Sequence, residues 1–104
     1  MANQLMKNEI ITLLNKRLKM CDDNLYKKYI GRNRRFTSFA NDVKYDLSHA
    51  MDRNTRIQIG YKYKKYCNDF RQTPTFDISK IGQSLKKFDD NIYSLCADYF
   101  QSTI

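Results

Sequence analysis

The sequence predicts an all-α fold, a compact bundle of four to five helices that forms a single domain over residues 1–104. Through most of the chain, apolar residues recur at steps of three and four, the period of a helix with one buried face. The chain also has only three glycines and one proline, which disfavours a fold made of many hairpins. A chain of 104 residues is long enough to fold as one domain without a metal or a disulfide.

The N-terminal half is predicted to contain three helices. The first covers residues 3–20, and its apolar stripe consists of Met6, Ile10, Leu13, Leu14 and Leu18. A short second helix follows, with Asp22 or Asp23 as its N-cap and Gly31 as its left-handed C-terminal stop. The third is expected to start at an N-cap of Thr37 or Ser38. Its apolar stripe consists of Phe36, Phe39, Ala40, Val43, Leu47, Ala50 and Met51.

Residues 55–63 fit two kinds of secondary structure. Apolar and polar residues alternate there, as in a strand, from Ile57 to Tyr63. Helical spacing connects Ile59, Tyr63, Tyr66 and Phe70. We favour the helix because its pattern continues past the alternation, and we expect Asp52 or Asn54 to cap it. Pro74 in the segment 71–75 then marks a break, since proline cannot donate a backbone hydrogen bond.

The C-terminal segment has the most regular pattern in the chain. Asp77 is expected to cap a long helix whose apolar positions alternate steps of three and four, as in a heptad seam. This seam consists of Ile78, Ile81, Leu85, Phe88, Ile92, Leu95 and Tyr99. Gly82 beside it leaves room for a close helix–helix approach. We expect the seam to pack against the other helices of the chain, with a homodimer or a partner helix as the alternative.

The chain has 19 Lys and Arg residues against 11 Asp and Glu, a formal net charge of +8. Such an excess attracts polyanions, of which nucleic acid is the commonest, although acidic proteins, anionic membranes and plain solubility also account for it. The N-terminal segment has too short an apolar stretch for a signal peptide or a membrane span. We therefore predict a protein of the cytoplasm, or of the host cytoplasm if the source is viral, with no membrane partner.

Residues that could carry chemistry are few. Cys21, Cys67 and Cys96 are widely spaced, without a CxxC pair, and His49 is the only histidine. This spacing fits free thiols in a reducing compartment, and neither a metal nor another cofactor is expected. Ser48 is expected to point away from His49, which leaves no catalytic pair, and the glycines are too scattered for a phosphate-binding loop. The chain is therefore predicted not to be an enzyme.

Basic residues interleaved with aromatic ones form the main functional pattern. Lys and Arg contact phosphates, and exposed aromatic rings stack on unpaired bases. Three arginines lie within four positions, on what is expected to be an exposed connection between helices. Among the aromatic residues, Tyr26 or Tyr29 and also Tyr61 are expected to be exposed. The candidate binding residues are Lys27, Lys28, Arg32, Arg34, Arg35, Arg53, Arg56, Tyr61, Lys62, Lys64 and Lys65.

The sequence therefore predicts a small basic binding module that contacts nucleic acid or a nucleoprotein complex. The alternative is a protein–protein inhibitor or adaptor that uses its charge on an acidic protein surface. In size, charge and its abundance of residues with A/T-rich codons, the chain resembles the host-takeover and defence-inhibitor proteins of phages, which include anti-CRISPR proteins. That resemblance implies a partner that belongs to a larger host machine.

Overall fold

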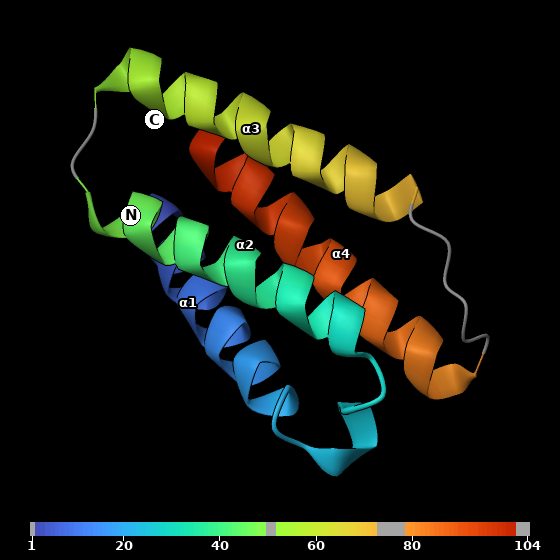
Figure 1. The fold of residues 1–104 in the computed structure, drawn as a ribbon. Helices are drawn as coiled ribbons and strands as arrows, with labels where there is room; N and C mark the ends of the chain where they lie inside the picture. The colour runs from blue at the N-terminus through green and yellow to red at the C-terminus, as the bar shows by residue number, and fades with distance from the viewer. Residues whose placement is uncertain (1, 50–51, 73–78, 102–104) are drawn as a thin grey trace. The chain divides into compact units, whose positions relative to one another are not determined.

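The computed structural model describes residues 2–49, 52–72 and 79–101, and in these ranges the chain is helical. Its α-helices are α1 (Ala2–Met20), α2 (Ile30–Ser48), α3 (Arg53–Gln72) and α4 (Lys80–Gln101), and a one-turn 3₁₀ helix, η1 (Asn24–Tyr26), lies between the first two (Figure 1). No strand occurs among the described residues. The predicted all-α class is confirmed, and the ambiguous segment 55–63 is helix.

The chain divides into two units, Met1–Ala50 and Met51–Ile104. The first contains α1, η1 and α2, and the second contains α3 and α4. Within each unit the two long helices run antiparallel (Figure 1). That the whole chain forms a single domain stays a prediction from the sequence.

In the first unit, the stripes predicted for α1 and α2 supply the buried apolar residues. These are Ile10, Leu14, Phe36, Phe39, Ala40, Val43 and Leu47. Arg17 extends the α1 stripe and is also fully buried. Its Nη2 donates a hydrogen bond to Asn33 Oδ1 at 2.8 Å, and its guanidinium carbon lies 5.2 Å from the centre of the Phe36 ring. Arg17 thus joins the end of α1 to the beginning of α2.

The start of α2 differs from the prediction. α2 begins at Ile30, so Gly31 is its second residue and not the left-handed end of an earlier helix; none of the described glycines has a positive φ. Asn33 explains the early start, because its backbone N–H donates to the Tyr29 carbonyl and its side-chain Nδ2 donates to the Tyr26 carbonyl. Thr37 does not cap the helix either: it lies inside it, and its hydroxyl donates to the Asn33 carbonyl.

The expected helix before Gly31 is reduced to η1. Asp23 caps it as predicted, since its Oδ1 accepts a hydrogen bond from the Leu25 N–H at 2.9 Å. Ser38, the other predicted cap of the third helix, lies inside α2. The early start of α2 moves the arginines that follow Gly31 from a connection onto a helix.

In the second unit, α3 and α4 pack closely in a register that their contacts define. Gly60 faces Phe100 and Gln101 near the end of α4, and the Tyr63 and Phe100 rings stack with their centres 5.0 Å apart. A Cβ added at Gly60 would lie 2.7 Å from Gln101 Cγ. Gly60 is therefore a position where glycine permits close helix packing. The sequence had indicated Gly82 for this role, and Gly82 is also buried.

Two cysteines contribute to this interior. Cys67 on α3 and Cys96 on α4 are buried free thiols. Burial raises the pKa of the Cys96 thiol, and the neighbouring Cys67 raises it further. A thiol that stays protonated in an apolar interior packs as a small hydrophobic side chain.

The heptad seam covers only part of the buried face of α4. Leu85 and Ile92 are buried, but Ile81, Phe88, Leu95 and Tyr99 are only half-buried. The buried face also includes Asp89, Tyr93, Cys96, Ala97 and Phe100, which lie off the seam. Ile78 and the predicted cap Asp77 lie outside the described residues. Ser79 caps α4, since its Oγ accepts a hydrogen bond from the Gly82 N–H at 3.2 Å.

The cap of α3 leads to a prediction about pH. Asp52 Oδ1 accepts a hydrogen bond from the Thr55 N–H at 2.7 Å, and this bond is the main cause that lowers the pKa of Asp52 below its ordinary value. A lowered folded-state pKa means that the cap stabilises the fold fully above the unfolded-state pKa, and that this contribution is lost as the pH falls through the folded-state value.

We expect the urea midpoint of the wild-type protein to fall more steeply between neutral pH and about pH 3 than that of Asp52→Asn. Asparagine also caps helices but does not titrate. The pH dependence that remains in Asp52→Asn therefore comes from the other carboxylates, and the difference from wild type comes from Asp52. Asp52→Ala should have a lower midpoint than Asp52→Asn at every pH. Wild-type and Asp52→Asn curves that run parallel would contradict this role.

No described helix has the length and the hydrophobicity that crossing a membrane requires.

Candidate nucleic-acid interface

The candidate basic residues lie in two stretches without an acidic residue, 24–41 and 53–68. The first stretch contains Lys27, Lys28, Arg32, Arg34 and Arg35, and the second contains Arg53, Arg56, Lys62, Lys64 and Lys65. Each stretch belongs to a different unit. We call them the first and the second basic stretch.

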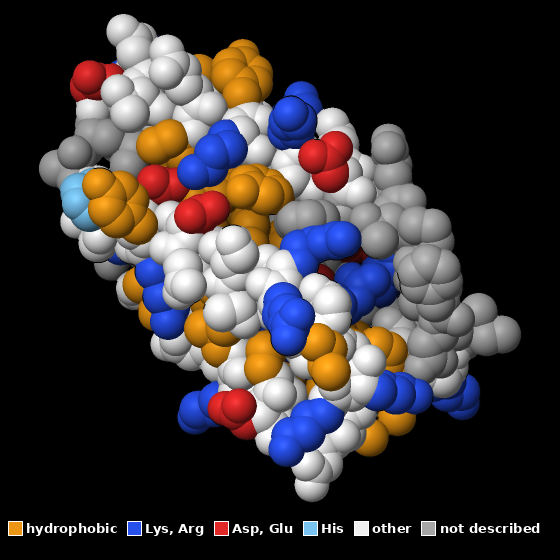
Figure 2. All heavy atoms as spheres, viewed as in Figure 1, with side chains coloured by type: hydrophobic (Ala, Val, Ile, Leu, Met, Phe, Trp, Pro, Cys, Tyr) orange, Lys and Arg blue, Asp and Glu red, His pale blue; other side chains and the backbone are white. Residues whose placement is uncertain are grey.

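In the first basic stretch, the three arginines lie on α2 and not on the expected connection. Arg32 and Arg35 are three positions apart and share one side of the helix, whereas Arg34 lies on another side. Lys27 and Lys28 follow η1 and are exposed. Figure 2 shows Lys and Arg side chains over the surface where η1 and the first half of α2 lie.

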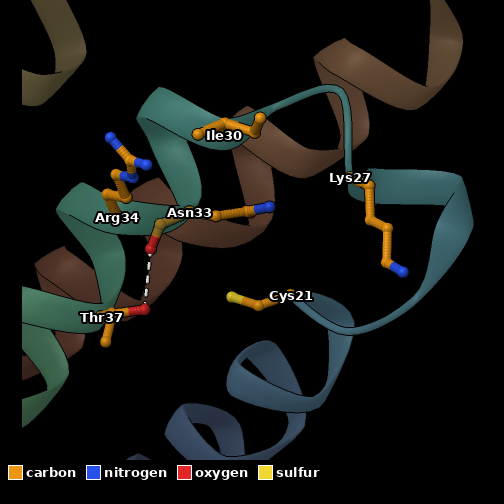
Figure 3. Close-up of a pocket in the computed structure, with 6 residues that line it drawn as sticks. All are labelled: Cys21, Lys27, Ile30, Asn33, Arg34 and Thr37. Atoms are coloured by element: carbon orange, nitrogen blue, oxygen red, sulfur yellow. Dashed lines mark hydrogen bonds between the residues drawn. The ribbon is translucent and has the colours of Figure 1, made fainter.

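Lys27 and Arg34 border a hollow of about 450 Å³ between the end of α1 and the beginning of α2. It is lined by Cys21, Lys27, Ile30, Asn33, Arg34 and Thr37. Figure 3 shows the Cys21 sulfur pointing toward Asn33 and Thr37, while Arg34 and Lys27 extend outward on opposite sides. The hollow thus has a partly apolar floor and a cationic rim.

The cations of the first stretch differ in how far they are engaged within the protein. Arg32, Arg35 and Lys28 have interactions with other residues, and the Lys28 ammonium lies 5.2 Å from the centre of the Tyr29 ring. The side chains of Lys27 and Arg34 are exposed, and neither side chain forms a hydrogen bond or an ion pair with a described residue. Lys27 and Arg34 are therefore the best placed to meet an external anion.

The helix start beside them adds to the positive potential. The N-cap of α2 is Tyr29, whose side chain accepts no hydrogen bond from the first turn, and that turn has no acidic residue. In contrast, Asp52 and Ser79 cap α3 and α4. The first N–H groups of a helix and its dipole favour anions, so the uncapped start of α2 and the nearby cations act in the same direction.

In the second basic stretch, the candidate binding residue Arg56 does not extend into solvent. It is half-buried, its Nη2 donates a hydrogen bond to the Tyr99 carbonyl at 3.2 Å, and its guanidinium carbon lies 4.6 Å from the centre of the Tyr99 ring. Tyr99 supplies one of the last carbonyls of α4, which lack helical donors. Arg56 therefore caps the end of α4 and belongs to the packing of the unit.

The other cations of this stretch are exposed along α3. Lys62 and Lys65 line a hollow of about 280 Å³ with Tyr66 and Asp69. Lys62 also lies 4.9 Å from the centre of the Tyr63 ring. The side chains of Arg53, Lys64 and Lys65 have no hydrogen bond or ion pair within the described part of the chain. The structure thus keeps four of the five cations of the second stretch at the surface.

The aromatic residues follow the prediction in part. Tyr61 is 63% exposed, as expected, whereas Tyr26 and Tyr29 are half-buried. Tyr45 is 63% exposed as well, and it was not among the candidates. Tyr45 lies in α2, and the apolar pattern of that helix identifies only the residues that face the interior. The pattern therefore did not identify Tyr45.

Ser48 and His49 are closer than the sequence suggested. Ser48 Oγ lies 3.1 Å from His49 Nδ1, so the expectation that Ser48 points away is wrong. Both side chains bond to the Tyr45 carbonyl, at 2.8 Å and 2.7 Å respectively. Because a carbonyl only accepts, His49 Nδ1 carries the proton and cannot take one from the serine. Within the described ranges, no three His, Cys, Asp or Glu side chains form a group that could hold a metal ion.

The chain matches no protein-family model, and searches of curated proteins and of solved structures find no match.

Proposed function

We propose that the protein is a non-enzymatic binding module for nucleic acid, alone or within a nucleoprotein complex. The observation that carries this proposal is the arrangement of Lys27 and Arg34 at the uncapped start of α2. Both cations are exposed and lack partners among the described residues. The amide groups of the first turn lie in the same region without an acceptor from the N-cap side chain. Phosphate groups satisfy both kinds of donor.

The test is binding of fluorescently labelled single- and double-stranded DNA and RNA of equal length, measured by anisotropy at several salt concentrations. We expect binding at low salt and a linear decrease of log K with log[salt], with a slope of roughly −0.7 to −0.9 for each phosphate contact. Absence of binding to all four probes at low salt would rule out this function.

One observation favours a second candidate, an adaptor or inhibitor that binds an acidic protein surface. Leu25 and Ile30 are 50% and 56% exposed and lie in the chain on either side of Lys27 and Lys28. Cations between exposed apolar residues fit an acidic protein segment with an apolar anchor. The double variant Leu25→Ser/Ile30→Ser separates the two functions: it should leave binding to nucleic acid nearly unchanged and abolish binding to such a protein partner in a pull-down.

A further inference from the structure

The C-terminal end of α2 carries an exposed aromatic pair, Tyr45 and His49. The two rings stack with their centres 3.9 Å apart and their planes inclined by 27°. Tyr45 is 63% exposed, and His49 is exposed as well. His49 covers one face of the Tyr45 ring, and no other ring or cation among the described residues contacts that tyrosine. An exposed aromatic face of this kind is available to a flat, apolar ligand.

Hydrogen bonds fix the orientation of the pair. His49 Nδ1–H donates to the Tyr45 carbonyl at 2.7 Å, and Ser48 Oγ donates to the same oxygen at 2.8 Å. The imidazole is therefore held over the tyrosine ring by the backbone at the end of its own helix. A rigid aromatic surface loses little conformational entropy when a ligand stacks on it. This distinguishes the pair from a single exposed tyrosine such as Tyr61.

Cations lie close to the pair within the same unit. Lys44 precedes Tyr45 in the chain, and it lines a hollow of about 350 Å³ together with Lys7 and Ser48. Ile11, Asn15 and Leu47 complete the lining. Ser48 thus belongs both to the wall of this hollow and to the hydrogen bonds that hold His49. Asp42, one turn before Tyr45, is half-buried, and Asp46, directly after Tyr45, is buried. Both carboxylates already have an interaction with another residue, so they do not offset the two lysines fully.

We propose that Tyr45 and His49 form a stacking platform for an unpaired nucleobase, whose adjoining phosphate lies near Lys44 and Lys7. Bases within a duplex are stacked on each other, so only a single strand, a loop or a strand end presents a free face. The platform therefore gives the protein a preference for single-stranded nucleic acid over duplex. This inference rests on the proposed function and adds the class of nucleic acid to it.

The experiment compares three labelled probes with equal numbers of phosphates: a short oligo(dT), an abasic strand of the same length, and a duplex. Wild-type protein should bind oligo(dT) more tightly than the abasic strand, because the two differ only in their bases. Tyr45→Ala should weaken binding to oligo(dT) by about 5- to 150-fold, the loss that corresponds to one stacked base. It should leave binding to the abasic strand unchanged.

Three further variants sharpen the test. Tyr45→Phe keeps the ring and should keep the affinity for oligo(dT), whereas Tyr45→Leu keeps apolar area without a ring and should behave like Tyr45→Ala. Lys44→Gln should weaken binding to oligo(dT) and to the abasic strand by similar factors, because it removes a phosphate contact. Since Tyr45 and Lys44 are exposed, far-UV circular dichroism should show every variant folded.

The possible failures are distinguishable. If no probe binds wild-type protein, the proposed function is wrong and the platform with it. If the probes bind but Tyr45→Ala matches wild type on oligo(dT), or loses as much on the abasic strand, only the platform is wrong. Equal affinity of wild type for oligo(dT) and the abasic strand leads to the same conclusion.

Discussion

Reversing the charge of Lys27 and Arg34 together, as Lys27→Glu/Arg34→Glu, should weaken binding to nucleic acid on the order of 10²-fold at about 0.1 M salt. Each phosphate contact that is lost removes roughly 0.9 or less from the slope of log K against log[salt], so the slope should decrease in magnitude by nearly two. Both side chains are exposed and make no hydrogen bond or ion pair with described residues. The fold should therefore tolerate the change.

A matched control separates contact from overall charge. Lys80→Glu/Lys87→Glu changes the net charge by the same amount, also at two exposed positions, but outside both basic stretches. We expect this control to weaken binding only slightly, through the long-range field. If the two double variants lose affinity equally, the attraction is nonspecific and the start of α2 is not the contact surface.

Replacing Gly60 and Gly31 with alanine should have opposite effects on stability. A Cβ at Gly60 would lie 2.7 Å from Gln101 Cγ and 3.1 Å from both the Gln101 nitrogen and the Phe100 carbonyl carbon. Two of these atoms belong to the backbone, so α4 itself would have to shift. Such overpacking costs about 1–3 kcal/mol and outweighs the gain of up to about 1 kcal/mol in helix propensity. We therefore expect Gly60→Ala to lower the unfolding midpoint.

At Gly31 the same substitution meets no atom within 4 Å, and the residue lies in a helix with a negative φ. Alanine there should stabilise the protein by up to about 0.5–1 kcal/mol. Urea denaturation followed by far-UV circular dichroism measures both variants. Gln101→Ala, combined with Gly60→Ala, should recover part of the loss by removing the closest contact. A Gly60→Ala variant as stable as Gly31→Ala would contradict the packing described for α3 and α4.

The helical periodicity of the sequence was sufficient to predict the fold class and most of the buried faces. Stripes such as Phe36, Phe39 and Val43 are buried as predicted, because the period of apolar residues follows directly from which side of a helix is buried. Caps made by a side chain, such as Asp23 and Asp52, were also predictable, since they depend on one residue and its nearest neighbours. The buried stripes and the caps depend on residues that are close together in the chain, so the sequence alone was enough to predict them.

Features that depend on contacts between distant residues were not predictable in the same way. α2 begins at Ile30 because the Asn33 side chain holds the Tyr26 carbonyl and accepts a bond from Arg17, which belongs to another helix. A glycine followed by basic residues also fits the end of a helix. The sequence alone therefore did not show that Gly31 lies at the start of α2. Arg56 is a second example: its position on α3 resembles that of a solvent-exposed cation until its contacts with Tyr99 are known.

The uncapped start of α2 also has a thermodynamic consequence. The N-cap side chain of α2 accepts no hydrogen bond from the first turn, and several arginines lie next to this turn. Both features lower the stability of the turn in the free protein. A ligand that supplies an acceptor at this turn stabilises it only when it is bound, so stability and ligand concentration become linked. On the proposed function, the protein melts at a higher temperature in the presence of its nucleic acid than in plain buffer. Nuclease treatment of a preparation that has retained nucleic acid then lowers the melting temperature, although the chain itself is unchanged.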